Sequence, residues 1–298
     1  MHLGSFSKMG ANIEYLEDDM IRIKLSNKRG NNIRLDFPSV GVTENLMLLG
    51  GFCGDVVKLD NIAKEPEIQE LANVLGKMGI VIRNDEGKRA VIYPQTKKLK
   101  PFEYTVMPDR IVTSTYMVAS AITNGNIVLE NVEPKNNQQE IDVLMNMGCH
   151  VLIYNKHIRI KGNDSLKAVP FLETLPYPGF PTDSQAQFLA LMTVCEGESC
   201  IRENIFPKRI NHALELKKMN QNIKVVEKNN ATDIIVNGTR DLLCQNLQAK
   251  DLRGGAALVI ASLRACGTSI VEGVSYIDRG YENLEGKLSS VGANIKRI

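Results

Sequence analysis

Three aspartates stand at matching positions of the sequence, each shortly before an apolar segment long enough to form a helix. They are Asp109 in MPDRIVTST, Asp183 in FPTDSQAQ and Asp251 in AKDLRGGAA. An aspartate at this position is a common helix N-cap, because its carboxylate accepts hydrogen bonds from the first free N–H groups. A carboxylate held against a substrate hydroxyl can instead take up its proton. The residue types alone leave both roles open.

Four arginines recur near the same segments. Arg110 and Arg253 lie at two of these helix starts. Arg209 and Arg279 lie near the equivalent positions of the sequence repeat described below. A lone arginine is most often a solvated surface residue. Helix N-termini, however, present unpaired N–H groups and a partial positive charge, which suit phosphate or carboxylate. If several such ends converge, we expect them to form a site for a polyanionic small molecule.

Other chemistries have little support in the sequence. The histidines lack metal-ligand spacing, and no Walker loop or G-x-G-x-x-G segment is present, so no metal and no cofactor is predicted. The 36 basic and 34 acidic residues include no long basic block, which argues against a nucleic-acid partner. No apolar run approaches the roughly 20 residues of a membrane span. The six scattered cysteines suggest buried thiols of a reducing compartment, so we expect a cytoplasmic protein.

An internal repeat indicates which elements position these residues. Turn residues that follow an amphipathic segment recur every 69 to 72 positions, at Gly10, Gly79, Gly148, Asn220 and Gly292. A second set keeps nearly the same interval, at Gly54, Gly125, Gly197 and Gly267. Glycine and then asparagine best tolerate the left-handed conformation after a helix, so we expect that conformation in the first set.

The pattern of each repeat predicts two strands, a buried helix, a strand and a surface helix, in this order. The segments IVTSTYMVASAI, QAQFLALMTVC and GGAALVIASLRAC are apolar nearly all round, which predicts helices buried on every side. EPEIQELANVLGKM and YENLEGKLSSV are amphipathic, and IRIKL and HIRIK alternate as half-exposed strands do. We therefore expect an α/β protein with helices inside and sheets outside. A length of 298 residues favours two domains.

The segments at the helix starts resemble those of the UDP-N-acetylglucosamine 1-carboxyvinyltransferases, a family of enolpyruvyl transferases. In order along the chain they are PSVGVTEN, EPEI, PDRIVT, PYPGFPTDSQAQ, AKDLRGGAALVIA and YIDRGYENLEGKL. This resemblance covers essentially the whole chain. It implies an inside-out α/β barrel (α+β in some schemes), with the substrate between two domains. Residues 1–106 would form a partial first domain, and residues 107–298 would form a second domain of three repeats that lacks the family's N-terminal strand segment.

The resemblance also implies a reaction. The enolpyruvyl group of phosphoenolpyruvate would move to the 3′-hydroxyl of UDP-N-acetylglucosamine with release of phosphate, the first committed step of peptidoglycan precursor synthesis. These two small molecules are the implied partners, and no metal is required. Asp183 would take the hydroxyl proton. Arg253 and Arg279 would face phosphoenolpyruvate, since forked guanidinium groups suit carboxylate and phosphate.

Further substrate contacts follow from the same resemblance. The implied substrate-binding residues are Ser39, Val40, Gly41, Glu65, Glu67, Arg110, Thr182, Ile205, Phe206, Arg209 and Arg253. Ser39, Val40 and Gly41 would meet the uridine diphosphate, and Ile205 and Phe206 would line the sugar-nucleotide pocket. Thr182 and Arg209 would position substrate and chain. For Glu65 and Glu67 a structural role is equally open, because negative side chains are favourable at the positive end of the helix dipole.

The sequence departs from the family at several points. The family's early Lys-Asn pair and its mobile general-acid loop would lie upstream of Met1, so we expect an N-terminally incomplete chain without measurable phosphate release. Pro207-Lys208 and Tyr276 replace Glu-Asn and His of many members, whereas Arg209 is kept. One alternative is a non-catalytic relative that binds a sugar nucleotide or a partner protein. Another is a shikimate-branch enolpyruvyl transferase, which PGFPTDSQAQ argues against.

Overall fold

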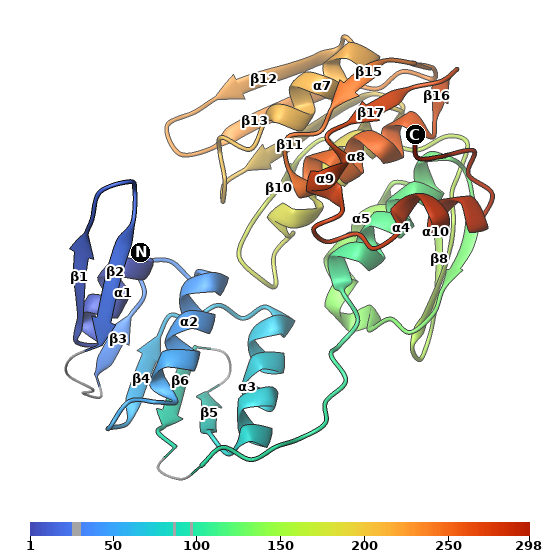
Figure 1. The fold of residues 1–298 in the computed structure, drawn as a ribbon. Coiled ribbons are helices and arrows are strands. Elements are labelled where there is room, and N and C mark those ends of the chain that lie inside the picture. Colours follow the sequence, from blue (N-terminus) through green and yellow to red (C-terminus); the bar gives the residue numbers. More distant parts are fainter. Residues whose placement is uncertain (26–30, 86–87, 96–97) are drawn as a thin grey trace. The chain divides into compact units, whose positions relative to one another are not determined.

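The chain folds into two mixed α/β units. The computed structural model describes residues 1–25, 31–85, 88–95 and 98–298. Unit 1 comprises Met1–Met107 and unit 2 comprises Pro108–Ile298 (Figure 1). None of the helices in the described ranges combines the length and the apolar character that a membrane crossing requires.

Unit 1 consists of a hairpin and a four-stranded sheet covered by helices. Its elements are α1 (His2–Lys8), β1 (Ala11–Tyr15), β2 (Ile21–Leu25), β3 (Asn32–Arg34), α2 (Val40–Gly50), β4 (Val57–Asp60), α3 (Pro66–Met78), β5 (Val81–Asp85) and β6 (Arg89–Tyr93). β1 and β2 pair as an antiparallel hairpin, while the sheet has the order β3-β4-β6-β5, with only β3–β4 parallel. α2 and α3 lie side by side against this sheet (Figure 1).

The sequence of unit 1 explains this packing. α2 buries Leu46 and Met47 against the sheet, and α3 buries Ile68 and Leu75 while its other side faces solvent. The amphipathic surface helix expected from EPEIQELANVLGKM is thus confirmed. Pro66 stands at the first helical position of α3, where its fixed φ suits the helix.

Unit 2 contains three repeats and is described throughout. Its elements are α4 (Arg110–Ile122), β7 (Asn126–Leu129), η1 (Pro134–Asn137), α5 (Gln138–Asn146), β8 (His150–Tyr154), β9 (His157–Lys161), β10 (Leu172–Glu173), η2 (Thr182–Ser184), α6 (Gln185–Met192), β11 (Glu198–Glu203), α7 (Asn211–Met219), β12 (Ile223–Glu227), β13 (Thr232–Asn237), β14 (Leu242–Leu243), β15 (Asn246–Gln248), α8 (Leu252–Ser262), β16 (Ala265–Cys266), β17 (Ile270–Glu272), α9 (Val274–Ile277) and α10 (Leu284–Ser290). η1 and η2 are short 3-10 helices.

The helices α4, α6 and α8 form the centre of unit 2. All eight residues of α6 are buried, as expected for a helix that is apolar on every side. Separate sheets flank the three helices: β7-β9-β8 beside α4, β10-β11-β13-β12 beside α6, and the pair β15-β17 beside α8. The predicted α/β class, with buried helices and outer sheets, is confirmed. Across Pro108–Ile298 the sheets do not join into one closed barrel.

Four of the five turn residues adopt the expected left-handed conformation, and Asn220 does not. The four glycines have φ values between 87° and 102°, whereas Asn220 is extended, with φ −135° and ψ 105°. The prediction was wrong for Asn220 because its side chain supplies a different helix end. Its amide donates to the carbonyl oxygens of Thr193 at 3.1 Å and Asn237 at 2.9 Å, which joins the end of α7 to two neighbouring segments.

The expectation of buried thiols holds for only half of the cysteines. Cys53, Cys149 and Cys195 are buried, Cys200 is half-buried, and Cys244 and Cys266 are exposed. Burial raises the pKa of Cys149 to about 11 and that of Cys195 to about 12. Cys244 and Cys266 are exposed because they lie at the short pair β14–β16, a two-stranded sheet at the surface of unit 2.

Candidate functional site

Two of the three aspartates that precede apolar helices are structural N-caps. Asp109 Oδ1 accepts hydrogen bonds from the backbone N–H groups of Ile111 at 2.7 Å and Val112 at 3.0 Å, at the start of α4. Asp251 Oδ1 accepts from the N–H of Gly254 at 2.8 Å, at the start of α8. Both carboxylates therefore satisfy free N–H groups of their own helices.

Asp183 has a different environment. It lies in η2, directly before α6, and the N-cap positions of η2 and α6 are held by Pro181 and Ser184. Its Oδ1 instead accepts a hydrogen bond from Arg209 Nη1 at 3.0 Å and lies 3.8 Å from Arg253 Nε. The Asp183 side chain is 38% exposed, so this carboxylate between two guanidinium groups is accessible to a ligand.

Arg253 is held in place by a polar network between the three central helices. Its Nη1 donates to the hydroxyl of Tyr281 at 3.4 Å, and its guanidinium carbon lies 5.8 Å from the centre of the Tyr281 ring. The Tyr281 hydroxyl also lies 2.9 Å from Thr115 Oγ1 of α4, and Gln187 Nε2 of α6 donates to both oxygens at 3.1 Å. Buried side chains with mutual hydrogen bonds hold fixed rotamers, so the guanidinium is oriented before any ligand binds.

Arg209 is the second arginine beside Asp183. Its Nη1 lies 3.3 Å from both the carbonyl oxygen and Oγ1 of Thr182, and its guanidinium carbon is 4.5 Å from the centre of the Phe206 ring. A guanidinium at this distance over a ring is favourable. Phe206 itself is 49% exposed, in the turn that follows β11. The structure thus brings five of the predicted residues together: Thr182, Asp183, Phe206, Arg209 and Arg253.

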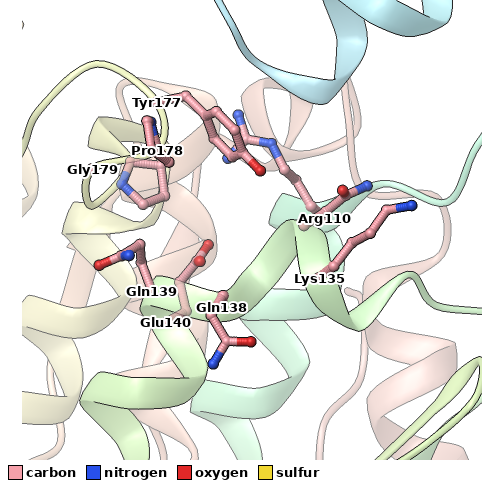
Figure 2. A pocket seen from close by; sticks show the side chains of 10 residues that line it. Arg110, Lys135, Gln138, Gln139, Glu140, Tyr177, Pro178 and Gly179 are labelled. Carbon is pink, nitrogen blue, oxygen red and sulfur yellow. The ribbon is translucent and has the colours of Figure 1, made fainter. Parts of the chain in front are cut away.

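Arg110 belongs to a separate small pocket. This pocket, of about 40 Å³, also contains Glu140 and Tyr177, and the Arg110 guanidinium carbon lies 5.9 Å from the centre of the Tyr177 ring (Figure 2). Burial raises the pKa of Glu140, an effect that Arg110 and a hydrogen bond from Ser184 Oγ oppose. Arg279 is exposed after α9. Of the four arginines that recur with the repeat, Arg209 and Arg253 share the carboxylate of Asp183.

The candidate residues of unit 1 lie at two helix starts. Ser39 is the N-cap residue of α2, followed by Val40 and Gly41, and Glu65 and Glu67 lie at the start of α3. The backbone N–H of Ala63 donates to Thr43 Oγ1 at 3.1 Å, which joins the segment before α3 to the first turn of α2. Burial raises the pKa of Glu44 in α2, and the charges of Glu67 and Glu65 raise it further. The two helix starts are therefore close neighbours.

Sequence reasoning missed Tyr281 and Glu203, which contact the predicted residues. Glu203 follows Ser199 and Ile201 on the buried side of β11, so a glutamate at an inward position of an alternating strand was a usable signal. For Tyr281 the sequence carried no comparable signal, because its partners lie 94 and 166 positions away. Among the described residues, no group of three or more histidine, cysteine, aspartate or glutamate side chains could hold a metal ion.

His212, on α7, is a buried histidine that the site does not use. It is 2% exposed, and neither ring nitrogen has a hydrogen-bond partner among the residues described. Burial lowers the pKa of His212 to about 4; Asp251 opposes this shift and Arg209 reinforces it. An unfolded histidine binds a proton near pH 6.5. The neutral buried ring therefore contributes stability that is fully present above pH 6.5 and is lost as the pH falls towards 4.

Because of this histidine, we expect the unfolding free energy of unit 2 to be about 2 kcal/mol lower at pH 5 than at pH 7. Urea unfolding at both pH values measures the difference, and His212→Leu should remove it. Leu216→Met, a volume-conserving change of a buried residue on the same helix, should alter stability equally at both pH values. The same pH dependence in the parent protein and in His212→Leu would contradict this prediction.

Comparisons with known proteins agree on one family. A sequence profile of EPSP synthase (3-phosphoshikimate 1-carboxyvinyltransferase) matches residues 1–288. UDP-N-acetylglucosamine 1-carboxyvinyltransferase 2 of Caldanaerobacter subterraneus subsp. tengcongensis is 43% identical over 298 residues, which cover 100% of this chain and 70% of that protein. UDP-N-acetylglucosamine 1-carboxyvinyltransferase of Finegoldia magna is 40% identical over 300 residues, with coverages of 100% and 70%.

Two solved structures share the fold. The enolpyruvyl transferase NikO from Streptomyces tendae superposes with a TM-score of 0.89 at 21% identity, covering 99% of this chain and 72% of that one. EPSP synthase from Acinetobacter baumannii gives a TM-score of 0.71 at 19% identity, with coverages of 99% and 71%. At these identities the likeness concerns the fold alone.

Proposed function

Because the chain belongs to the UDP-N-acetylglucosamine 1-carboxyvinyltransferase family, we propose that it serves enolpyruvyl transfer to UDP-N-acetylglucosamine, with Asp183 as proton acceptor. This family consists of transferases that act in peptidoglycan precursor synthesis. One observation carries the assignment of Asp183: its accessible carboxylate lies between Arg209 and Arg253, whereas the aspartates at the matching positions cap helices. A proton acceptor must be free to meet a substrate, and a capping carboxylate is not.

The proposed reaction assigns a role to each group of this cluster. The 3′-hydroxyl oxygen of the sugar bonds to the phosphate-bearing carbon of phosphoenolpyruvate while the carbon–carbon double bond opens; Asp183 takes the hydroxyl proton, and the methylene carbon gains a proton from an acid. The methylene carbon then loses a proton, the double bond re-forms, and the bond from the phosphate-bearing carbon to the phosphate oxygen breaks, so that phosphate leaves with that bond's electron pair. Arg253 and Arg209 hold the carboxylate and phosphate of phosphoenolpyruvate, since guanidinium groups bind such anions by forked hydrogen bonds.

The other predicted residues keep proposed roles. In unit 1, Ser39, Val40 and Gly41 supply the first N–H groups of α2, which suit a diphosphate. In unit 2, Ile205 and Phe206 form the turn that would line a sugar nucleotide. The roles of Glu65, Glu67, Arg110 and Arg279 stay predictions.

Replacing Asp183 tests the assignment. We expect Asp183→Asn to bind inorganic phosphate about fivefold more tightly, because removing a carboxylate about 4 Å from an arginine relieves roughly 1 kcal/mol of competing charge interaction in water. Calorimetric titration of the chain with phosphate measures this change. Asp241→Asn, which removes the same charge from an exposed site of unit 2, should leave the affinity unchanged.

Equal phosphate affinity in the parent protein and in Asp183→Asn would contradict the proposed site. Titration with UDP-N-acetylglucosamine provides a second check, and no heat at millimolar ligand would count against binding. The absence of turnover expected from the sequence stays a prediction, which a phosphate-release assay of the same protein checks.

A further inference from the structure

The carboxylate of Glu203 is completely buried at the end of β11, and both of its oxygens accept hydrogen bonds. Oε1 accepts from Thr174 Oγ1 at 2.9 Å and from the backbone N–H groups of Ile205 and Phe206, each at 2.8 Å. Oε2 accepts from Thr182 Oγ1 at 2.9 Å. Glu203 is 0% exposed, and burying a carboxylate is costly unless such donors replace water. A set of four donors on one buried group indicates a specific structural task.

These donors come from three segments that are separate in the sequence. Thr174 follows β10, its backbone N–H donates to the carbonyl oxygen of Arg202 at 2.9 Å, and its hydroxyl also accepts from the N–H of Asn204 at 2.9 Å. Ile205 and Phe206 belong to the turn after β11, and Thr182 opens η2. Glu203 therefore joins the edge of a sheet to the turn and to the start of the central helix α6.

The hydroxyl of Thr182 connects Glu203 to the candidate site. It donates to Glu203 Oε2 and accepts from Arg209 Nη1 at 3.3 Å, and the same Nη1 donates to Asp183 Oδ1 at 3.0 Å. Because Thr182 and Asp183 are adjacent in the chain, fixing the first limits the orientations of the second. Glu203 itself is fully buried and does not meet a ligand.

We propose that Glu203 is a positioning residue, which orients the Asp183 carboxylate and the Arg209 guanidinium through Thr182 and fixes the Ile205–Phe206 turn. This inference rests on the function proposed for Asp183. Neither oxygen can be replaced by an amide nitrogen without loss, since an –NH₂ group facing Ile205 and Phe206 meets donors, and one facing Thr182 reverses that hydrogen bond.

Two variants of Thr182 and one of Glu203 test the proposal. Thr182→Val removes the hydroxyl at nearly constant shape, whereas Thr182→Ser keeps it. We expect Glu203→Gln and Thr182→Val to weaken UDP-N-acetylglucosamine binding about tenfold, a typical loss for a hydrogen bond to a charged group. Thr182→Ser, which restores the hydroxyl, should recover most of the affinity that Thr182→Val loses. Glu198→Gln, the same change at the exposed start of β11, is the matched control.

A second readout separates positioning from general stability. The side-chain Nε–H signal of Arg209 in the ¹⁵N NMR spectrum, assigned with Arg209→Lys, should move in Glu203→Gln and Thr182→Val but stay in place in Thr182→Ser and Glu198→Gln. Circular dichroism confirms that each variant is folded. If Glu203→Gln does not fold, the valine and serine variants decide, because Thr182→Val leaves three of the four donors on Glu203 intact and Thr182→Ser leaves all four.

The outcomes distinguish this inference from the proposed function. The positioning role is overturned if the Arg209 signal does not move in Thr182→Val, or if Thr182→Ser loses as much affinity as Thr182→Val. Either result counts even if Asp183→Asn behaves as expected. Unchanged phosphate affinity in Asp183→Asn, by contrast, contradicts the proposed function, and the Arg209 signal still tests whether Glu203 orders the cluster.

Discussion

Replacing Arg253 with methionine is expected to weaken the binding of inorganic phosphate to the protein roughly 10- to 100-fold, the loss that follows from removing a hydrogen bond between charged groups. Arg253 is only 17% exposed and is oriented by Tyr281, Thr115 and Gln187. A guanidinium that is fixed before binding loses little entropy when an anion arrives, so its removal should cost most of its interaction energy. Methionine keeps a long unbranched side chain in the space and removes only the charge and the donors.

The measurement is calorimetric titration with phosphate at constant ionic strength. Arg240→Met removes the same charge from an exposed position of unit 2 and should change the affinity less than about twofold, because exposed charges are screened by salt. Parent-like affinity in Arg253→Met would show that phosphate does not bind at this cluster. Because Asp183→Asn is expected to act in the opposite direction, the pair of variants distinguishes a charge effect from unfolding.

Replacing Phe188 with alanine is expected to lower the unfolding free energy of unit 2 by about 3–5 kcal/mol. Phe188 is 0% exposed in α6, the helix whose eight residues are all buried. Its ring meets that of Phe180 edge to face, with ring centres 4.9 Å apart and planes at 83°. Alanine leaves a cavity that cannot collapse, because sheets and central helices enclose α6 and close-packed interiors relax only in part.

Urea unfolding at neutral pH measures this loss. Phe171→Ala is the matched control. The Phe171 side chain is 49% exposed, and the guanidinium carbon of Arg202 lies 5.0 Å from the centre of its ring. Its removal should therefore lower the unfolding free energy by less than about 1 kcal/mol. If Phe188→Ala leaves too little folded protein to measure, Phe188→Leu should still show a partial loss. A cost below about 1 kcal/mol for Phe188→Ala would contradict the central position of α6.

Part of the site was predictable because it depends on local sequence. Asp109 and Asp251 have the residue type and position of N-caps, and the structure shows both capping. Asp183 has the same local pattern, and in the sequence only the family resemblance of the segment PYPGFPTDSQAQ sets it apart. Its partner Arg209 lies 26 positions further along the chain. Only the packing of the turn after β11 against η2 brings the two together.

Asn220 and Tyr281 show the same limit. Asparagine is suited to a left-handed turn, yet Asn220 is extended because carbonyl oxygens 27 and 17 positions away accept hydrogen bonds from its amide. In the sequence, Tyr281 is an aromatic residue of the segment YIDRGYENLEGKL without a role of its own. In the structure, its hydroxyl contacts helices from two other repeats. In both cases a distant partner outweighs the local preference.

The sequence by itself determined the repeat, the helices that are buried and those that lie at the surface, because the spacing of apolar residues within one helix or strand settles which sides leave water. The tertiary structure alone decided which aspartate faces two arginines, which arginines meet, and that Glu203 holds the turn beside them. The contact of Asp183 with Arg253 joins two repeats, and the contacts of Asp183 with Arg209 and of Glu203 with its donors join separate segments of one repeat. Their geometry depends on how whole helices and sheets pack, and a repeat that returns every 69 to 72 residues places chemically similar residues at several equivalent positions.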